Sequence, residues 1–214
     1  MDGTLVDTER LWFVAEGDVV SQLGGVWRPE HQAALVGGNL RRTTRYMLDV
    51  TGVDIAEEDI AAQLLDRMAE LLSHDVTPLP GAAELLSDLH RAEVPCALVT
   101  ATHRRLVEPV LDAVGREYFA VSVAGDEVRH SKPAPDPYLT AAALLGVDPA
   151  HCVALEDSPT GVASAEAAGC MTVAIPSLLA IAPGPDRVIV SSLREVTLSW
   201  LEQLAAVWDS RAAS

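Results

Sequence analysis

The sequence contains little cysteine and few positively charged side chains. Three of its 214 residues are cysteines, Cys96, Cys152 and Cys170, and they form no C-x-x-C or Cys/His pattern. This spacing gives no sign of a cysteine-ligated metal and favours buried, reduced thiols in a cytoplasmic protein. Lys and Arg number 15 against 31 Asp and Glu, so the net charge is −16. Such a surface repels phosphate backbones, and we expect no nucleic acid among the partners.

Long apolar runs are also missing. No run approaches the ~20 residues that a membrane-spanning helix needs, because Pro176 and Pro183 interrupt the most apolar stretch. The sequence shows neither a leader pattern nor a heptad repeat, so we expect a monomer without a membrane partner. A hydrophobic content of 49% still predicts a globular protein with a sizeable core, either one α/β domain with an insertion or two small domains.

The apolar pattern changes along the chain. Residues 9–77 have apolar side chains at helical spacing and contain no expected strand. From Gly81 onward, helices alternate with short apolar strands, which predicts a parallel sheet covered on both faces. The expected strands are 95–99, 120–123, 152–155, 171–175 and 188–190. The expected helices of this part are 82–91, 104–114, 136–145, 160–168 and 193–207.

Four short segments place polar side chains at the edges of these elements. In chain order they are 1–4 (MDGT), 98–100 (LVT), 131–136 (SKPAPD) and 153–158 (VALEDS). Asp2, Thr100, Glu156 and Asp157 lie at or just beyond the ends of apolar runs. Because ligands bind beyond the carboxyl ends of the strands in open α/β sheets, we expect these side chains to converge.

In this order the four segments resemble the motifs of the haloacid dehalogenase (HAD) superfamily of phosphotransferases. The resemblance covers nearly the whole chain and implies an α/β fold, an HAD-like (Rossmann-like) parallel-sheet core with an inserted α-helical cap domain. It assigns residues 1–8 and 79–214 to the core and residues 9–78 to the cap. The hinges would lie near Asp7-Thr8 and at residues 78–81, and the cap would select the substrate.

The resemblance also implies catalytic roles for the motif residues. Asp2 would protonate the leaving alkoxide and then take a proton from the attacking water. Thr100 would hydrogen-bond a phosphoryl oxygen, and Lys132 would neutralise the developing charge. Asp157, with Glu156 directly or through water, and the main-chain carbonyl of Asp2 would hold Mg²⁺.

Each of these side chains also has a structural interpretation. Thr100 is a possible N-cap for the helix expected from residue 104, because Thr is common at that position. Lys132 is a possible solvated loop residue, although its flanking prolines favour a fixed position. Glu156 and Asp157 are possible caps of the helix expected from residue 160, but two acids at a buried strand end are costly without a cation.

In the cap, the segment Gly37-Gly38-Asn39-Leu40-Arg41-Arg42 is the best candidate for a substrate-reading loop. Arg41 would bind an anionic or hydroxylated substrate. The alternative is equally open: Arg41 and Arg42 are surface arginines at the start of a helix.

The segments 7–12 and 146–157 look most like those of bacterial phosphatases of sugar and sugar-alcohol phosphates. An acid at Asp2 favours phosphate-ester chemistry, because the branches that cleave carbon–halogen or carbon–phosphorus bonds lack it. The β-phosphoglucomutase branch carries a cap His where Trp12 stands, which disfavours the alternative of a phosphosugar mutase. The expected reaction is Mg²⁺-dependent hydrolysis of a small phosphorylated metabolite.

The resemblance places the family's nucleophilic Asp one position before Met1, at the end of a central strand. The chain as printed therefore lacks that group, and we expect it to have little or no activity. Three explanations have to be separated. The native protein starts upstream of Met1, the chain is a truncated fragment, or the protein is a non-catalytic phosphosugar-binding or regulatory protein.

Overall fold

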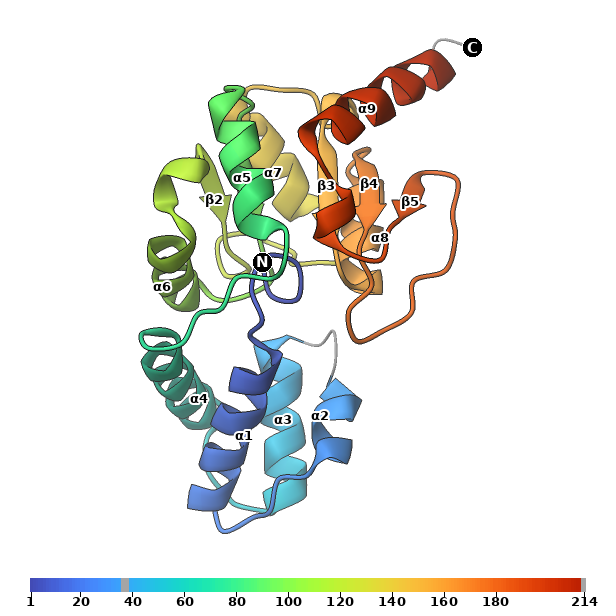
Figure 1. Ribbon diagram of the computed structural model, residues 1–214. Coiled ribbons are helices and arrows are strands. Elements are labelled where there is room, and N and C mark those ends of the chain that lie inside the picture. The colour runs from blue at the N-terminus through green and yellow to red at the C-terminus, as the bar shows by residue number, and fades with distance from the viewer. Residues whose placement is uncertain (36–38, 213–214) are drawn as a thin grey trace.

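The computed structural model describes residues 1–35 and 39–212, which form a helical lobe and an α/β lobe (Figure 1). The helical lobe contains α1 (Glu9–Gln22), α2 (Pro29–Leu35), α3 (Leu40–Thr51) and α4 (Glu57–Leu72). The strands of the other lobe are β1 (Ala97–Val99), β2 (Val121–Val123), β3 (Val153–Glu156), β4 (Met171–Ala174) and β5 (Arg187–Ile189). Its helices are α5 (Ala82–Arg91), α6 (Arg104–Val114), α7 (Asp136–Leu145), α8 (Pro159–Ala167) and α9 (Leu198–Ala212).

The last helix begins later than its apolar pattern predicts. The segment Leu193–Glu195 forms a separate 3-10 turn, and α9 starts at Leu198. Thr197 sets this start, because its hydroxyl oxygen accepts a hydrogen bond from the backbone N–H of Trp200 at 3.2 Å. Gly81 packs against the turn so closely that a Cβ there would lie 2.6 Å from the backbone nitrogen of Arg194. The chain therefore bends at this point instead of continuing one helix.

The strands pair in parallel, as predicted, but they form two sheets. In one sheet β1 pairs with β2, and in the other β4 lies between β3 and β5. Within residues 1–35 and 39–212, no strand joins β1 to β3. The amino-terminal segment makes only isolated bridges, between Asp2 and Val6 and between Val6 and Pro78. The inner edges of β1 and β3 therefore lack a partner strand in the described part of the chain.

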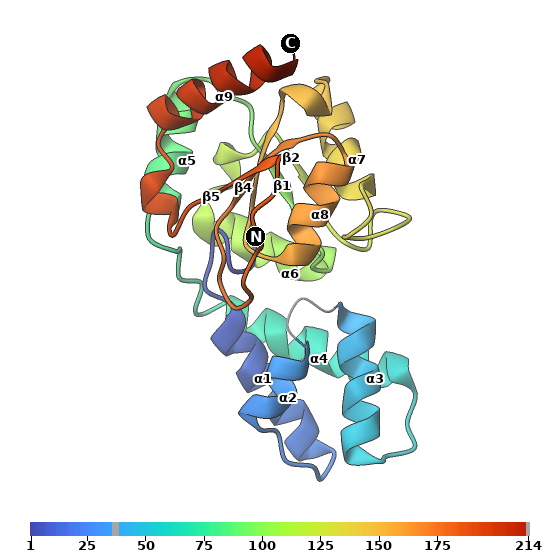
Figure 2. The same cartoon turned by 90° about the vertical axis from the view of Figure 1, so that its right-hand side faces the viewer.

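Helices cover both faces of the strands. Figure 2 shows α5 and α9 on one side and α7 and α8 on the other. One apolar cluster joins α5 to β4 through Leu85, Leu89 and Val173, and another joins α8 to β3 through Ala154 and Ala165. This is the doubly covered arrangement that continuous apolar strands predict.

The helical lobe packs on the α/β lobe mainly through α4 and α6. A shared apolar cluster includes Leu64 and Met68 of α4 and Leu106 and Val110 of α6. The chain passes between the lobes twice, and the two passages are hydrogen-bonded to each other over residues 5–7 and 77–79. In the part of the chain that the structure describes, no helix is long and apolar enough to cross a membrane.

Candidate active site

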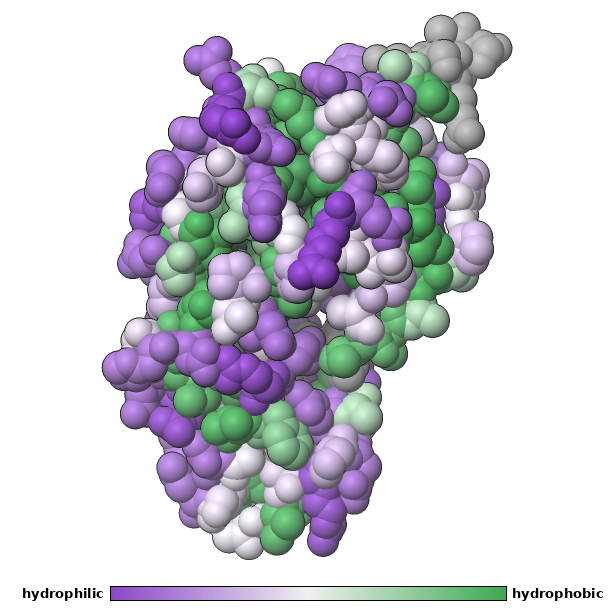
Figure 3. All heavy atoms as spheres, in the orientation of Figure 1, coloured by the Kyte–Doolittle hydropathy of each residue, from purple (hydrophilic) through white to green (hydrophobic). Residues whose placement is uncertain are grey.

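A cavity of about 200 Å³ lies between the two lobes and is lined by at least one residue of each of the four motifs. Figure 3 shows the surface hollowed where the lobes meet. From the α/β lobe, Asp2, Thr100, Lys132, Glu156 and Asp157 line the cavity. The structure thus brings together side chains that are far apart in the sequence, at the strand ends where convergence was expected.

Three threonine hydroxyls surround the carboxylate of Asp2. Thr8 donates to one carboxylate oxygen at 2.6 Å and Thr102 to the other at 2.7 Å. The hydroxyl of Thr100 lies 3.5 Å from the second oxygen. These bonds fix Asp2 at the floor of the cavity. The sequence analysis did not identify Thr8 or Thr102 as site residues, because threonines beside a motif form no recognisable pattern.

Asp157 lies beside Asp2 on the same floor. Its two carboxylate oxygens accept hydrogen bonds from Thr4 at 3.2 Å and from Ser177 at 2.8 Å. Gly3 has a φ of +67°, and a Cβ there would lie 2.2 Å from the Asp157 carboxylate, so only glycine fits. Burial raises the pKa of Asp157, and the amino-terminal amine of Met1 opposes that rise. Met1 itself lines the cavity.

Lys132 and Glu156 form a buried ion pair, with side chains 8% and 5% exposed. Lys132 also donates to the main-chain carbonyl of Val99 at 3.1 Å, and Tyr138 donates its hydroxyl to Glu156. A Cβ at Gly161 would lie 1.8 Å from the Glu156 carboxylate, so the start of α8 leaves no space for any other residue. Lys132 is thus fixed rather than solvated, and Glu156 is its counter-ion.

The structure argues against the capping roles of Thr100, Glu156 and Asp157. The helix after the fourth motif is capped by Ser158, whose hydroxyl oxygen accepts from the backbone N–H of Gly161 at 3.1 Å. His103 caps α6. The first backbone N–H of that helix, from Arg104, donates to a carboxylate oxygen of Asp126 at 2.7 Å. Because both helix starts have other partners, the motif side chains are left to face the cavity.

The oxygen-rich floor fits a hard cation such as Mg²⁺ better than a softer metal. Asp157 has no cationic side-chain partner among the described residues, and it lies beside Asp2. Within residues 1–35 and 39–212, no group of three or more His, Cys, Asp or Glu side chains is placed to hold a metal ion. Glu156 is bound to Lys132 and Tyr138, so in the structure it is the counter-ion of Lys132.

Arg41 lies outside the cavity. Its side chain is 71% exposed, and its Nε is 3.9 Å from a Glu57 carboxylate oxygen. Asn39 caps α3 by accepting from the backbone N–H of Arg42 at 3.0 Å. This geometry favours the interpretation of Arg41 and Arg42 as surface arginines at a helix start. Gly37 and Gly38 of the same predicted loop lie outside the described residues.

The helical lobe instead presents one face of α1 to the cavity. Glu9, Trp12 and Glu16 follow each other at helical spacing and all line the cavity. Burial and the negative charges of Asp2, Asp157 and Asp7 raise the pKa of Glu9 to about 7. Burial likewise raises the pKa of Glu16 to about 7, although its hydrogen bond from Trp27 lowers it. Two carboxylates in one cavity wall are a feature that the sequence analysis missed.

The raised pKa of Glu16 predicts a pH-dependent stability. The pKa is about 7 in the folded protein against 4.5 for an unperturbed Glu. The folded state therefore binds this proton more tightly, and the stabilisation is complete below pH 4.5 and is lost as the pH rises through 7. We expect Glu16→Gln to match the parent at pH 5 and to exceed its unfolding free energy by roughly 1–3 kcal/mol at pH 8.

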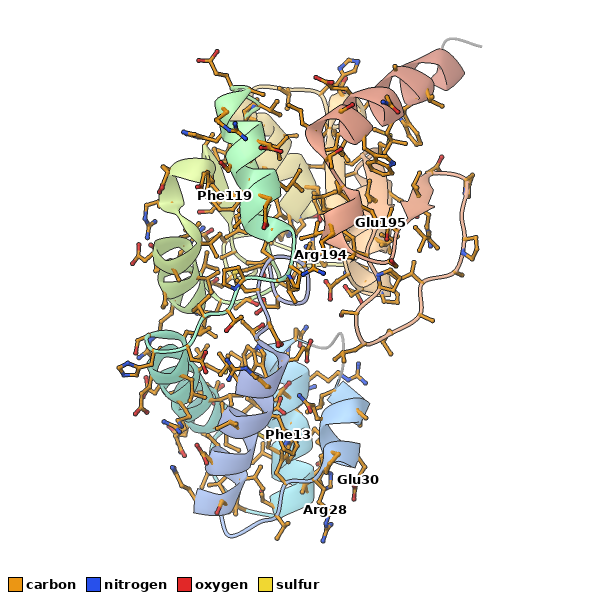
Figure 4. All side chains as sticks on the ribbon, in the orientation of Figure 1. Phe13, Arg28, Glu30, Phe119, Arg194 and Glu195 are labelled. Atoms are coloured by element: carbon orange, nitrogen blue, oxygen red, sulfur yellow. The ribbon has the colours of Figure 1, made fainter. Side chains whose placement is uncertain are left out.

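Thermal unfolding at both pH values measures this difference. Glu30→Gln is the matched control, because Glu30 is exposed at the start of α2, on the outer side of the helical lobe (Figure 4). The expected gain for Glu16→Gln at pH 8 is on the order of 5 °C in Tm, with no change for Glu30→Gln. A difference between Glu16→Gln and the parent that is the same at pH 5 and pH 8 would contradict the prediction.

Comparison with known proteins agrees with this geometry. The family model of the haloacid dehalogenase-like hydrolases matches residues 1–169. Hexitol phosphatase A of Escherichia coli (strain K12) is 34% identical over 208 residues, which cover 93% of this chain and 91% of that protein. Fructose-1-phosphate phosphatase YqaB of the same organism is 32% identical over 170 residues, or 79% and 89% of the two chains.

A solved structure shares the fold over nearly the whole chain. It is CbbY from Rhodobacter sphaeroides in complex with phosphate, with a TM-score of 0.84 and 31% identity over 94% of this chain and 96% of that one. The family model, the curated relatives and this structure confirm the resemblance found in the four motifs. The chain belongs to the haloacid dehalogenase-like hydrolase family.

Proposed function

We propose that this protein is a Mg²⁺-dependent phosphatase of a small phosphomonoester, a sugar phosphate or sugar-alcohol phosphate. The observation that carries the proposal is the floor of the cavity, where Asp2, Thr100, Lys132 and Asp157 face one enclosed space. The names of the relatives support the substrate class, since they include phosphatases of hexitol phosphates and of fructose 1-phosphate.

In the proposed reaction a carboxylate attacks phosphorus, and the bond to the substrate oxygen breaks. Asp2, oriented by Thr8 and Thr102, gives its proton to the departing alkoxide. Asp2 then takes a proton from water, whose oxygen attacks the aspartyl-phosphate, releases phosphate and restores the carboxylate. Thr100 hydrogen-bonds a phosphoryl oxygen, and Lys132 supplies positive charge at the edge of the same space.

The attacking carboxylate belongs, in this proposal, to an Asp joined to the nitrogen of Met1. Support comes from the position of Met1, which lines the cavity and whose amine lies close enough to Asp157 to affect its pKa. A residue joined to that nitrogen would stand beside Asp157. We propose that turnover depends on this Asp.

We propose Asp157 and the main-chain carbonyl of Asp2 as the ligands of Mg²⁺, with Glu156 acting at most through water. Mg²⁺ keeps several waters in most protein sites, so few protein ligands suffice. When bound, it would neutralise phosphoryl oxygens. The division into a core at 1–8 and 79–214 and a cap at 9–78, the monomeric state and the cytoplasmic location stay predictions.

Ligand binding tests the site without requiring turnover. We expect inorganic phosphate to raise the Tm of the printed chain in the presence of Mg²⁺ and to do so much less without it. Asp157→Asn should weaken Mg²⁺ binding at least tenfold, because an amide provides one neutral oxygen in place of a charged carboxylate. Asp126→Asn, on the α6 side of the α/β lobe, is the control. If phosphate raised the Tm by the same amount with and without Mg²⁺, and equally in the parent and in Asp157→Asn, the assignment of Asp157 as a Mg²⁺ ligand would be refuted.

A further inference from the structure

The wall opposite the catalytic floor is rich in carboxylate and has no cation. We call Glu9, Trp12 and Glu16 the α1 wall. Three further polar side chains, Gln32, Asn39 and Thr43, and three leucines, Leu35, Leu40 and Leu65, also line this side of the cavity. The helical lobe contributes no Lys or Arg to the described lining. The part of a substrate that extends away from the phosphate therefore meets two carboxylates and no cation on this side.

Glu16 is held in place with one oxygen still available. It is only 4% exposed, and one of its carboxylate oxygens accepts from the indole N–H of Trp27 at 3.1 Å. Trp27 is in turn stacked on His31, with ring centroids 5.0 Å apart. No other hydrogen bond or ion pair to Glu16 is present among the described residues, so its second oxygen can serve a ligand in the cavity.

Glu9 is also without a side-chain partner among the described residues. Its position along α1 is closer to Asp2 and Asp157, whose charges act on it. Gln32 donates to the main-chain carbonyl of Glu9 at 2.9 Å, which ties α2 to this end of α1. A buried carboxylate without a partner is costly. Glu16 is buried and Glu9 is half-buried, and their lack of protein partners indicates that a ligand supplies the missing donors.

The charges of the cavity limit what that ligand can be. Its described lining carries five carboxylates, Asp2, Glu9, Glu16, Glu156 and Asp157, against one Lys, which is paired with Glu156. One phosphate can be accommodated at the floor with Lys132 and a cation. A second phosphate would lie against the α1 wall with no counter-charge, and like charges at short range in an enclosed site repel strongly.

We infer that the α1 wall is a subsite that reads hydroxyl groups: Glu9 and Glu16 accept hydrogen bonds from the unphosphorylated part of a polyol phosphate and disfavour a second phosphate. The inference rests on the proposed function and narrows its substrate class to monophosphates of neutral, hydroxylated chains. Trp27 is a positioning residue for Glu16, and Trp12 contributes an apolar surface between the two acceptors.

Calorimetric titration of the printed chain with Mg²⁺ at pH 8, above the pKa of about 7 of Glu9 and Glu16, tests this without turnover. The probes are inorganic phosphate, a hexitol 6-phosphate and a hexitol 1,6-bisphosphate. We expect the hexitol 6-phosphate to bind at least tenfold more tightly than inorganic phosphate, which is the gain of one or two hydrogen bonds to a charged acceptor. We expect the bisphosphate to bind no more tightly than inorganic phosphate.

Glu16→Gln changes the polarity of the subsite with little change in shape. Trp27 would occupy the single amide oxygen, so the NH₂ group would face the cavity as a donor. We expect this variant, and Trp27→Phe, to lose about tenfold in affinity for the hexitol 6-phosphate while binding inorganic phosphate as before. The control Glu30→Gln should retain both affinities. Unchanged inorganic phosphate binding also shows that each variant is folded.

Three results would overturn the inference. Glu16→Gln could bind the hexitol 6-phosphate like the parent, the bisphosphate could bind more tightly than the monophosphate, or an amino-sugar phosphate could bind at least tenfold more tightly than the hexitol 6-phosphate. The last result would identify an ammonium subsite. Failure of the parent to bind inorganic phosphate at all would instead remove the proposed function, and this inference with it.

Discussion

A chain extended at its amino terminus by a short apolar segment ending in Asp, with that Asp directly before Met1, is expected to gain turnover of para-nitrophenyl phosphate. The expected gain is roughly a thousandfold or more over the printed chain, the scale on which enzymes depend on a catalytic nucleophile. The assay is initial rate with Mg²⁺ at neutral pH. The gain is expected because Met1 lines the cavity, so a residue joined to its nitrogen would lie at or near the cavity floor.

The same extension is expected to stabilise the fold. β1 and β3 belong to separate sheets and have no strand between them in the described residues. An apolar segment paired with both would bury several side chains, each worth about 1.5–3 kcal/mol. Even part of that sum is large against a typical domain stability of about 5–15 kcal/mol. A higher Tm for the extended chain, with or without Mg²⁺, is the corresponding measurement.

Two controls separate the catalytic effect from the structural one. An extension that ends in Asn should stabilise the protein as much as the Asp version and yet give no turnover. Asp2→Asn in the Asp-extended chain should also abolish turnover, because the leaving alkoxide loses its proton donor. Turnover by the printed chain at the rate of the extended one would contradict the prediction and require another nucleophile.

The same comparison tests the non-catalytic alternative. If neither form turns over a phosphomonoester but both are stabilised by inorganic phosphate with Mg²⁺, the protein is a phosphate-binding module and not a phosphatase. Turnover in the extended form alone identifies an enzyme whose nucleophile precedes Met1.

Local patterns along the chain predicted most of the fold. The bounds of α5, α6 and α7 match the helices 82–91, 104–114 and 136–145 that were expected from the alternating pattern. The strands were found because buried parallel strands are continuously apolar. The division into two sheets was not predicted as a topology, since no local pattern states which strands become neighbours.

The floor of the site could be predicted from the sequence, but its wall could not. Asp2, Thr100, Lys132 and Asp157 stand in motifs whose order carries information, and the structure brings them into one cavity. Glu16 stands in an ordinary helical segment, and only the packing of Trp27 and His31 around it gives it a buried place. Arg41 was chosen from the sequence because it stands in a glycine-rich loop of the expected cap, whereas the burial of Glu16 cannot be seen in the sequence.

Replacing Lys132 by Met is expected to weaken both the fold and phosphate binding. The ion pair with Glu156 is buried on both sides. Breaking such a pair by removing one partner costs about 3–5 kcal/mol, because the remaining charge stays buried. For a chain of this size we expect a fall in Tm on the order of 10 °C. Phosphate affinity should fall as well, since Lys132 is the only Lys or Arg in the described lining of the cavity.

A second substitution distinguishes the two roles of this lysine. In Lys132→Met/Glu156→Gln the uncompensated charge is gone, and Tyr138 can still donate to the amide oxygen. We expect this double variant to recover most of the lost Tm, because the cost lay in the unpaired carboxylate and not in the absence of the lysine. Phosphate affinity should stay low, since no cation has been restored to the cavity. Recovery of both properties together would mean that Lys132 acts only through the fold, and recovery of neither would mean that Glu156 has a function beyond pairing with Lys132.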